Sequence, residues 1–465
     1  MVASAARRLG YLGQHVRLVR PAAGLTSDLS VKGSEEIVSK KGELASFLIA
    51  WPGHGGETVT WKLTKDGHPL EKPARGEGTA VLDATGRAQI AGRLDEPGCL
   101  RCEVRSGDAV ALGGVAVSPH EILSSLPVPP DFDSFWAAKK AELAAMPANT
   151  RLHPIHAVDG SGKHTAAGTG DLLGPEERKA VLAPGIDAFE VQVADSLFGA
   201  GVSAYLARPA GAKPRSLPAV LLVHGAGVYT SDLQSAMRWA GGGGPGEDRG
   251  PPALAMDMNA HGIPNGKAES FYQNLAAGEL ADYRIHGRED RDKCYFLGML
   301  LRLVRAIDVL TIQPEWDGRT VAVFGVSQGG LQAIAAAGLN ADRVTFFAAG
   351  VPAGCDHTGH LATSPRTCGW PQIARQPHAG ADQPAVDEAV RPNRRSPLPH
   401  SFPHREDAVA QVRYFDCVNF ASRATAPSQW SVGLIDTVCP PTSVFAAYNA
   451  LPLSNQKAMH LDAWA

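Results

Sequence analysis

The hydrophobic pattern around residues 320–338 predicts the most distinctive local structure of the chain. Val321, Val323 and Phe324 form a short apolar, β-branched run, which is typical of a strand covered on both faces. A glycine-rich stretch follows directly, and residues 331–337 are then strong helix formers. The pattern therefore predicts a buried strand, a tight turn and a helix, in that order.

Strand-like and helix-like patterns alternate through the second half of the chain. Residues 269–310 carry apolar side chains close to one face of a helix. Shorter apolar runs typical of buried strands lie at 218–223, 253–258, 343–349 and 430–435, and two earlier runs, 188–193 and 202–206, predict a pair of edge strands. This alternation predicts an α/β fold with a mostly parallel sheet and right-handed crossovers.

The N-terminal part has a different pattern. Between about residues 30 and 120, short alternating runs and turn signals recur at the spacing of a β-sandwich; Val59, Trp61 and Leu63, for instance, alternate before a Lys-Asp-Gly turn. We predict an all-β, immunoglobulin-like domain that serves as a spacer or docking module. The alternative is a binding domain in which Trp51 and Trp61 stack on sugar rings.

A proline-rich stretch, 126–130, predicts a stiff linker, after which Asp131 is expected to cap a helix. The linker separates two predicted folding units. The sequence thus predicts a poorly structured N-terminus (1–29), a β-sandwich-like domain (30–120) and an α/β domain (121–465).

Composition narrows the function classes. The chain has 465 residues, of which 44% are hydrophobic and 20% charged, so it can bury a large core in more than one domain. A net charge of -3 with scattered Lys and Arg predicts neither a nucleic-acid nor a membrane partner. The first twenty residues make a poor signal peptide, so the compartment stays open; a secreted or periplasmic location would need a different N-terminus.

The cysteines predict neither a disulfide framework nor a metal site. Their number is seven, which is odd, and the chain is large. Cys99 and Cys102 form a C-x-x-C pair inside an alternating run, where an offset of three places the two thiols on opposite faces of a strand. We expect Cys102 to be a core residue.

The turn after the strand at residues 321–324 carries a candidate nucleophile. Gly325-Val326-Ser327-Gln328-Gly329 fits G-x-S-x-G, in which glycines permit a strained strand-to-helix turn and leave the serine hydroxyl exposed above the sheet. Ser327 would therefore be the nucleophile of a serine hydrolase. A glycine-rich turn with an idle serine is the alternative.

Two loops are expected to support this nucleophile. In serine hydrolases the oxyanion is held by backbone N–H groups, here of Ala226, in the loop after strand 218–223, and of Gln328. His224 is expected to order its loop rather than to act as a base. Asn259 and His261 follow the strand at 253–258, and we expect them to line a pocket or to order a loop.

Asp436 is the candidate acid of a triad. It directly follows the strand at 430–435, and the chain order nucleophile, acid, histidine fits this fold class. The acid would fix the tautomer of a histidine and stabilise its charged form. The alternative is an ordinary helix N-cap.

Several segments, taken together, resemble a known family. These segments are 131–136, 325–330, Val351-Pro352 with Cys355-Asp356, 414–416 with 419–421, and 433–441 with 445–449. Across most of residues 125–457 they resemble the acetyl xylan esterase and cephalosporin-C deacetylase family of carbohydrate esterases. The resemblance implies an α/β-hydrolase fold without metal or cofactor, Ser327 and Asp436 as nucleophile and acid, and Ala226 and Gln328 as oxyanion donors. It also implies deacetylation of xylo-oligosaccharides or similar small acetylated molecules.

The chain departs from the family pattern at three places. Ala226 replaces a tyrosine, and Asn259-Ala260-His261 replaces an arginine-glycine-glutamine motif. The general-base histidine is expected after the last strand, where this chain stops, and His460 lies within that strand, too far from the nucleophile to replace it.

These departures predict an esterase that is truncated before its last helix and impaired. The alternatives are an inactive hydrolase-fold binding protein and an esterase or peptidase for another acyl substrate. The oligomeric state is not predicted, and a homo-oligomer remains open.

Overall fold

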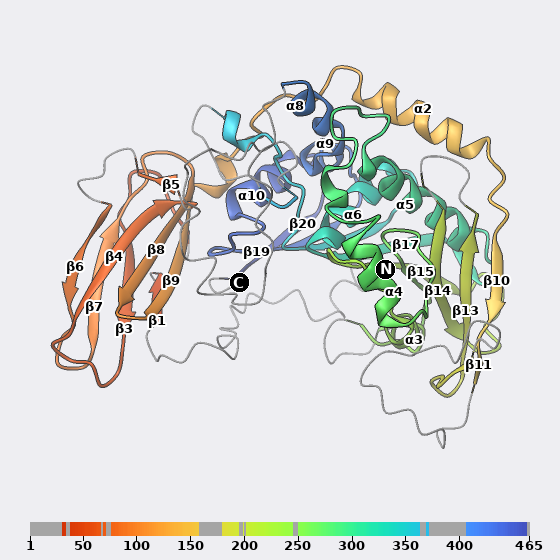
Figure 1. Cartoon of the computed structure of the whole chain (residues 1–465), viewed down its shortest axis with the longest axis horizontal. Helices are drawn as coiled ribbons and strands as arrows, with labels where there is room; N and C mark the ends of the chain where they lie inside the picture. The colour runs from red at the N-terminus through yellow and green to blue at the C-terminus, as the bar shows by residue number, and fades with distance from the viewer. Residues whose placement is uncertain are drawn as a thin grey trace.

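The structure is a computed structural model that describes ten stretches of the chain. These are residues 30–33, 38–66, 68–70, 76–157, 179–194, 199, 201–244, 250–362, 369–371 and 406–462. The predicted unstructured N-terminus, 1–29, lies outside the described residues. Figure 1 shows an all-strand part beside a larger part in which helices cover a sheet.

The N-terminal part is built from two sheets. Its strands are β1 (Ser30–Gly33), β2 (Val38–Ser39), β3 (Ala45–Ala50), β4 (Thr58–Lys65), β5 (His68–Pro69), β6 (Glu77–Val81), β7 (Arg87–Gly92), β8 (Gly98–Ser106) and β9 (Ala109–Val117). One sheet has the order β1-β3-β7, and the other has the order β2-β9-β8-β4-β5 with β6 paired to β4. Phe47, Ile49 and Leu63 are buried between them. An immunoglobulin-like topology stays a prediction.

Strand β8 presents its two faces to different cores. Cys102 packs in the core of the N-terminal sheets, whereas Cys99 belongs to the core of the α/β part. The predicted opposite orientation of the two thiols is therefore confirmed. The N-terminal part is packed directly on the α/β part at this strand, and the contact becomes important below.

The α/β part is organised around a nine-stranded sheet. Its strands are β10 (Arg151–Pro154), β13 (Ile186–Val193), β14 (Val202–Pro209), β15 (Leu217–Val223), β16 (Leu254–Met258), β17 (Trp316–Val326), β18 (Phe346–Gly350), β19 (Ser428–Gly433) and β20 (Lys457–Asp462), in the spatial order β10-β13-β14-β16-β15-β17-β18-β19-β20. The six strands from β16 to β20 are mutually parallel, as predicted. The two strands predicted to form an edge pair, β13 and β14, do pair with each other. Neither is at the edge of the sheet, because β14 also pairs with β16 and β10 is the edge strand.

Helices cover both faces of this sheet. They are α2 (Phe132–Ala144), α3 (Leu233–Ala240), α4 (Glu269–Ala277), α5 (Tyr295–Thr311), α6 (Gln328–Leu339), α8 (Glu406–Val412), α9 (Cys417–Ala421) and α10 (Pro441–Ala450). Along β14, Tyr205 packs with the core under α3, whereas Leu206 packs with the core under α5 and α6. Because successive strand side chains point to opposite faces, α3 lies on one face and α5 and α6 lie on the other.

The start of α2 differs from the expectation. The side chain of Asp131 makes no capping hydrogen bond to the helix. Instead its carboxylate accepts a hydrogen bond from Arg291 Nη1 at 2.7 Å and another from the Tyr414 hydroxyl. A partner from a distant segment therefore outcompetes the local backbone. Within the described residues, no helix is long and apolar enough to cross a membrane.

Candidate active site

Ser327 has the backbone geometry expected of an exposed nucleophile. It links β17 to α6 with φ 59° and ψ -121°, a region that costs a non-glycine residue about 1–3 kcal/mol. Its N–H donates to Gly350 O at 2.8 Å, and its carbonyl accepts from Leu331 N at 3.1 Å and Ala353 N at 3.0 Å. Hydrogen bonds on both sides therefore hold the strained residue in place.

The motif glycines are required by close backbone packing. A Cβ atom on Gly325 would lie 2.2 Å from Gly329 O, and one on Gly329 would lie 2.3 Å from Val223 O. Both distances are shorter than any real carbon–oxygen contact, and the obstructing atoms are backbone. The turn can therefore form only because neither residue carries a side chain.

The proposed oxyanion donors lie on either side of Ser327. Gln328 is the first residue of α6, so its N–H has no acceptor within the helix. Ala226 follows Gly225, whose added Cβ would be 3.9 Å from Ser327 Cβ. The loop after β15 therefore runs beside the serine.

His224 and Asn259 organise this loop. Ala260 N donates to His224 Nε2 at 3.1 Å, so Nδ1 carries the proton and donates to Gly225 O at 2.9 Å. Burial lowers the pKa of His224, which favours this neutral form. Asn259 Nδ2 donates to Tyr229 O at 2.8 Å. Both side chains are committed to the backbone, which agrees with a loop-ordering role.

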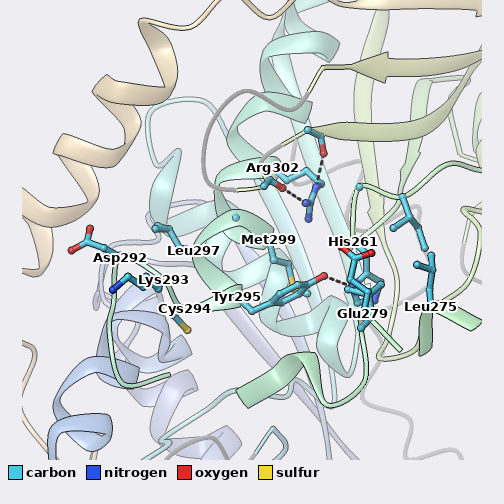
Figure 2. A pocket seen from close by; sticks show the side chains of 16 residues that line it. His261, Leu275, Glu279, Asp292, Lys293, Cys294, Tyr295, Leu297, Met299 and Arg302 are labelled. Atoms are coloured by element: carbon cyan, nitrogen blue, oxygen red, sulfur yellow. Dashed lines mark hydrogen bonds between the residues drawn. The ribbon is translucent and has the colours of Figure 1, made fainter. Parts of the chain in front are cut away.

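His261 also binds the backbone of the loop that follows β15. Its Nε2 donates to Gly227 O at 2.9 Å, and its Nδ1 accepts from the Tyr295 hydroxyl at 2.7 Å (Figure 2). Burial lowers the pKa of His261 to about 4, so the ring is neutral at pH 7. Tyr283 contributes from the same side, because its hydroxyl donates to Gln328 Oε1 at 2.6 Å.

A cavity of about 530 Å³ lies behind His261. Its wall includes Glu279, Lys293, Tyr295 and Arg302, and neither Ser327 nor Asp436 lines it. Figure 2 shows the hydroxyl of Tyr295, which also lines the cavity, pointing toward His261. We therefore do not assign this cavity as the substrate site.

Arg302 binds the backbone around residues 259–261, the segment that stands in place of the arginine-glycine-glutamine motif of the family. From α5 its Nε donates to Gly201 O at 2.6 Å and its Nη2 donates to Gly199 O (Figure 2). Its Nη1 donates to Ala260 O. It is buried, with 4% of its surface exposed. An arginine from another element thus packs on the Asn259-Ala260-His261 segment. The sequence did not point to Arg302, Tyr283 or Tyr295 as residues of the candidate site. A helical pattern of apolar residues predicts which side chains are buried, but not which distant residue each one bonds to.

Asp436 lies at the same edge of the sheet as Ser327. Strands β17, β18 and β19 are parallel neighbours, and Asp436 follows the end of β19 as Ser327 follows β17. Two strand spacings separate the ends of β17 and β19 by about 10 Å. Asp436 Oδ1 accepts from Val438 N at 2.7 Å and Cys439 N at 2.9 Å. Asp436 is not an N-cap, because that position of α10 is Pro440.

His460 lies in β20, three strands from β17. The register aligns Val326, Gly350, Ser431 and His460 in one row across the four strands. Three spacings amount to about 14 Å, which is beyond the reach of an imidazole that must contact Ser327. Asp462, at the carboxyl end of β20, pairs with Gly433 at the end of β19. The carboxyl end of β20 therefore lies beside the end of β19, where the loop to Asp436 begins.

A family model described as acetyl xylan esterase (AXE1) matches residues 177–364 and 398–462, which together are more than half of the chain. The chain belongs to the acetyl xylan esterase family. The predicted family is thus confirmed, and an esterase of the hydrolase class is supported with it. In the part of the chain that the structure describes, no group of three or more His, Cys, Asp or Glu side chains is arranged to hold a metal ion.

Other members and structures are similar over most of their length. The acetyl esterase Axe7A of Xylanibacter ruminicola is 29% identical over 440 residues, covering 91% of this chain and 83% of that protein. The acetyl xylan esterase structure from Paenibacillus sp. R4 has a TM-score of 0.50 and 23% identity, covering 74% of this chain and 91% of that one. That of Thermoanaerobacterium sp. JW/SL YS485 has a TM-score of 0.49 and 22% identity, covering 74% of this chain and 90% of that one. The Paenibacillus likeness shows the acetyl xylan esterase fold.

Replacing Ser327 by glycine should stabilise the protein. Glycine adopts φ 59°, ψ -121° without strain, so we expect Ser327→Gly to raise the free energy of unfolding by about 1 kcal/mol in urea titrations. Ser327→Ala is the matched control, because it removes the hydroxyl and keeps the Cβ atom. Equal stability of the two variants would contradict strain at this residue.

His261 should make the protein sensitive to mild acid. Its folded pKa of about 4 lies below the ordinary histidine pKa of 6.5, so the unfolded chain binds more protons between these pH values. The free energy of unfolding should therefore fall as pH drops from 6.5 toward 4, by about 1.4 kcal/mol per pH unit from this residue.

The variant His261→Gln can keep both hydrogen bonds but cannot titrate. We expect it to lose about 2 kcal/mol less stability than the parent between pH 7 and pH 5. Urea unfolding at the two pH values measures the difference. An unchanged pH dependence in the variant would show that His261 is not buried in its neutral form.

Proposed function

We propose that this protein is a serine carboxylesterase that removes acetyl groups from small acetylated carbohydrates, xylo-oligosaccharides among them. Family membership supports the esterase class, and the names of its relatives favour acetyl substrates. The observation that carries the proposal is the strained turn at Ser327, which lies beside the oxyanion loop and at the same sheet edge as Asp436. Such strain is retained where it serves a function.

The proposed reaction has two halves. Ser327 Oγ attacks the acetyl carbonyl, the sugar hydroxyl leaves with a proton, and water then releases acetate from the acyl-serine. The backbone amides of Ala226 and Gln328 bind the negatively charged oxygen of each tetrahedral intermediate. Fixed amides suit this task because they need no reorganisation when the charge develops.

In the family that the chain belongs to, the proposed base is a histidine that follows the strand equivalent to β20. The carboxyl end of β20 lies beside β19, so Asp436 could fix the ring and stabilise its charged form. In the 465-residue chain β20 is followed by Ala463, Trp464 and Ala465, which lie outside the described residues.

Among the described histidines, His224 and His261 are bonded to the loop backbone and His460 lies about 14 Å from the β17 end of its row, so none of these three is placed to act as the base. We therefore propose that the 465 residues, assayed as such, supply the nucleophile, acid and oxyanion donors of a serine esterase and turn over slowly until a base is added.

Exogenous imidazole tests this assignment. A small base should partly replace the histidine and accelerate acetate release from acetylated xylotriose on the order of 10²-fold, in proportion to its concentration. Ser327→Ala is the matched control and should show no acceleration. Butanoyl and octanoyl esters, assayed in parallel, should react more slowly if the site is built for acetyl groups.

Each outcome decides a separate part of the proposal. Acceleration that is equal with and without Ser327 would contradict the serine mechanism and favour a binding protein on a hydrolase scaffold. Rapid turnover without imidazole, lost in Ser327→Ala, would instead show that another group acts as the base. A preference for longer acyl chains would contradict the acetyl substrate.

A further inference from the structure

The loop that carries Asp436 is held at both ends by the N-terminal β part. In Figure 1 the strands β4, β8 and β5 lie next to α10 and the end of β19. The contacts bracket Asp436 in sequence. One lies at Leu434, two residues before it, and the other at Thr442, six residues after it.

The first contact fixes the start of the loop. Cys99 Sγ, on β8, donates to Leu434 O at 3.3 Å. On the adjacent strand β9, a Cβ atom added to Gly114 would lie 2.7 Å from both Leu434 Cβ and Leu434 O. Cys99 and Leu434 are each 1% exposed. The backbone of β9 therefore packs directly on the residue that leads into the acid turn.

The second contact fixes the end of the loop. The Thr442 hydroxyl, in the first turn of α10, donates to Oδ2 of Asp66, the residue directly after β4. Thr442 is 0% exposed and Asp66 is 6% exposed. A buried carboxylate requires donors, so this hydrogen bond is costly to remove. Farther along α10, Asn449 Nδ2 donates to the carbonyls of Pro119 and Ile122, which follow β9.

Between these anchors the carboxylate of Asp436 depends on a short backbone turn. Val438 N and Cys439 N both donate to Oδ1, so any shift of residues 434–442 moves the carboxylate. The α/β part contributes a further contact, from Trp370 N to Val438 O at 2.7 Å. The anchors at both ends come from a part of the chain outside the matched family segments, which begin at residue 177.

We propose that the N-terminal β part positions the triad acid, with Asp66 and Gly114 as positioning residues. The role of the acid rests on the proposed function. The β part thus acts as a scaffold for residues 434–442, instead of the spacer or sugar-binding domain that the sequence left open. A prepositioned carboxylate lets a histidine bind in one orientation without first ordering the loop.

The anchoring can be tested without any catalytic assay. Cys439 is 2% exposed and lies inside the bracketed loop, so its alkylation by N-ethylmaleimide reports loop opening. Thr442→Val removes the hydroxyl at constant shape, whereas Thr442→Ser keeps it. We expect Cys439 alkylation, followed by peptide mass spectrometry, to accelerate about tenfold in the valine variant and little in the serine variant. Cys102, in the core of the β part, is the internal control and should stay protected in every variant.

A second variant acts on the other anchor. Gly114→Ala places a methyl group against Leu434 and should expose Cys439 to a similar extent, with Cys102 still protected. Cys439 protection equal to that of the parent chain in both Thr442→Val and Gly114→Ala would overturn the proposal. Exposure of Cys439 together with Cys102 would also overturn it, because the β part would then be unfolding as a whole.

Kinetics separate this proposal from the proposed function. In Thr442→Val the imidazole-dependent rate should fall about tenfold in kcat with KM unchanged, and Thr442→Ser should restore it. An open loop with an unchanged rate would contradict the assignment of Asp436 as the acid, while the anchoring measured by alkylation would stand.

Discussion

The site depends on the close approach of three backbone segments at the carboxyl end of β17. Gly325, Gly329 and the carbonyl of Val223 leave no space for a side chain, and this contact forces the chain to turn at Ser327. The turn costs about 1–3 kcal/mol in backbone strain. It persists because α5 and α6 are buried along nearly their whole length against the sheet, which outweighs a cost of that size.

The same constraint orders the surrounding loop. A serine presented at one fixed place is useful only if the donors proposed to bind the oxyanion are equally fixed. Here neutral His224, Asn259 and neutral His261 each donate a hydrogen bond to a different backbone carbonyl of the loop. Asp436 is held differently, by a turn whose ends rest on the N-terminal β part. The site is therefore assembled from parts of the chain more than 300 residues apart, such as Cys99 and Leu434, separated by 335.

Local features were predictable from the sequence, whereas contacts between distant segments were not. The strand, turn and helix around Ser327, and the position of Asp436 after a strand, follow from hydrophobic period and glycine spacing. No local pattern predicts the hydrogen bonds from Arg302 to Ala260 and from Thr442 to Asp66, because they join residues that only the complete fold brings together. The same reason explains Asp131, which fits a cap by sequence but binds Arg291 and Tyr414 in the structure. Cys99 is a further example. The alternating pattern predicted that its thiol points away from that of Cys102, but not that the α/β part packs on that face of the strand.

The most direct measurement is the site of covalent modification by a small phosphonofluoridate, whose phosphorus mimics the tetrahedral acyl centre. After hours of exposure in the presence of imidazole, peptide mass spectrometry should find one adduct, on Ser327, because the proposed oxyanion amides of Ala226 and Gln328 would bind the phosphoryl oxygen there. Replacing Ala226 by glycine, which retains the amide, should leave the labelling intact. An adduct on a different serine, or an unmodified Ser327 in a folded protein, would contradict the account.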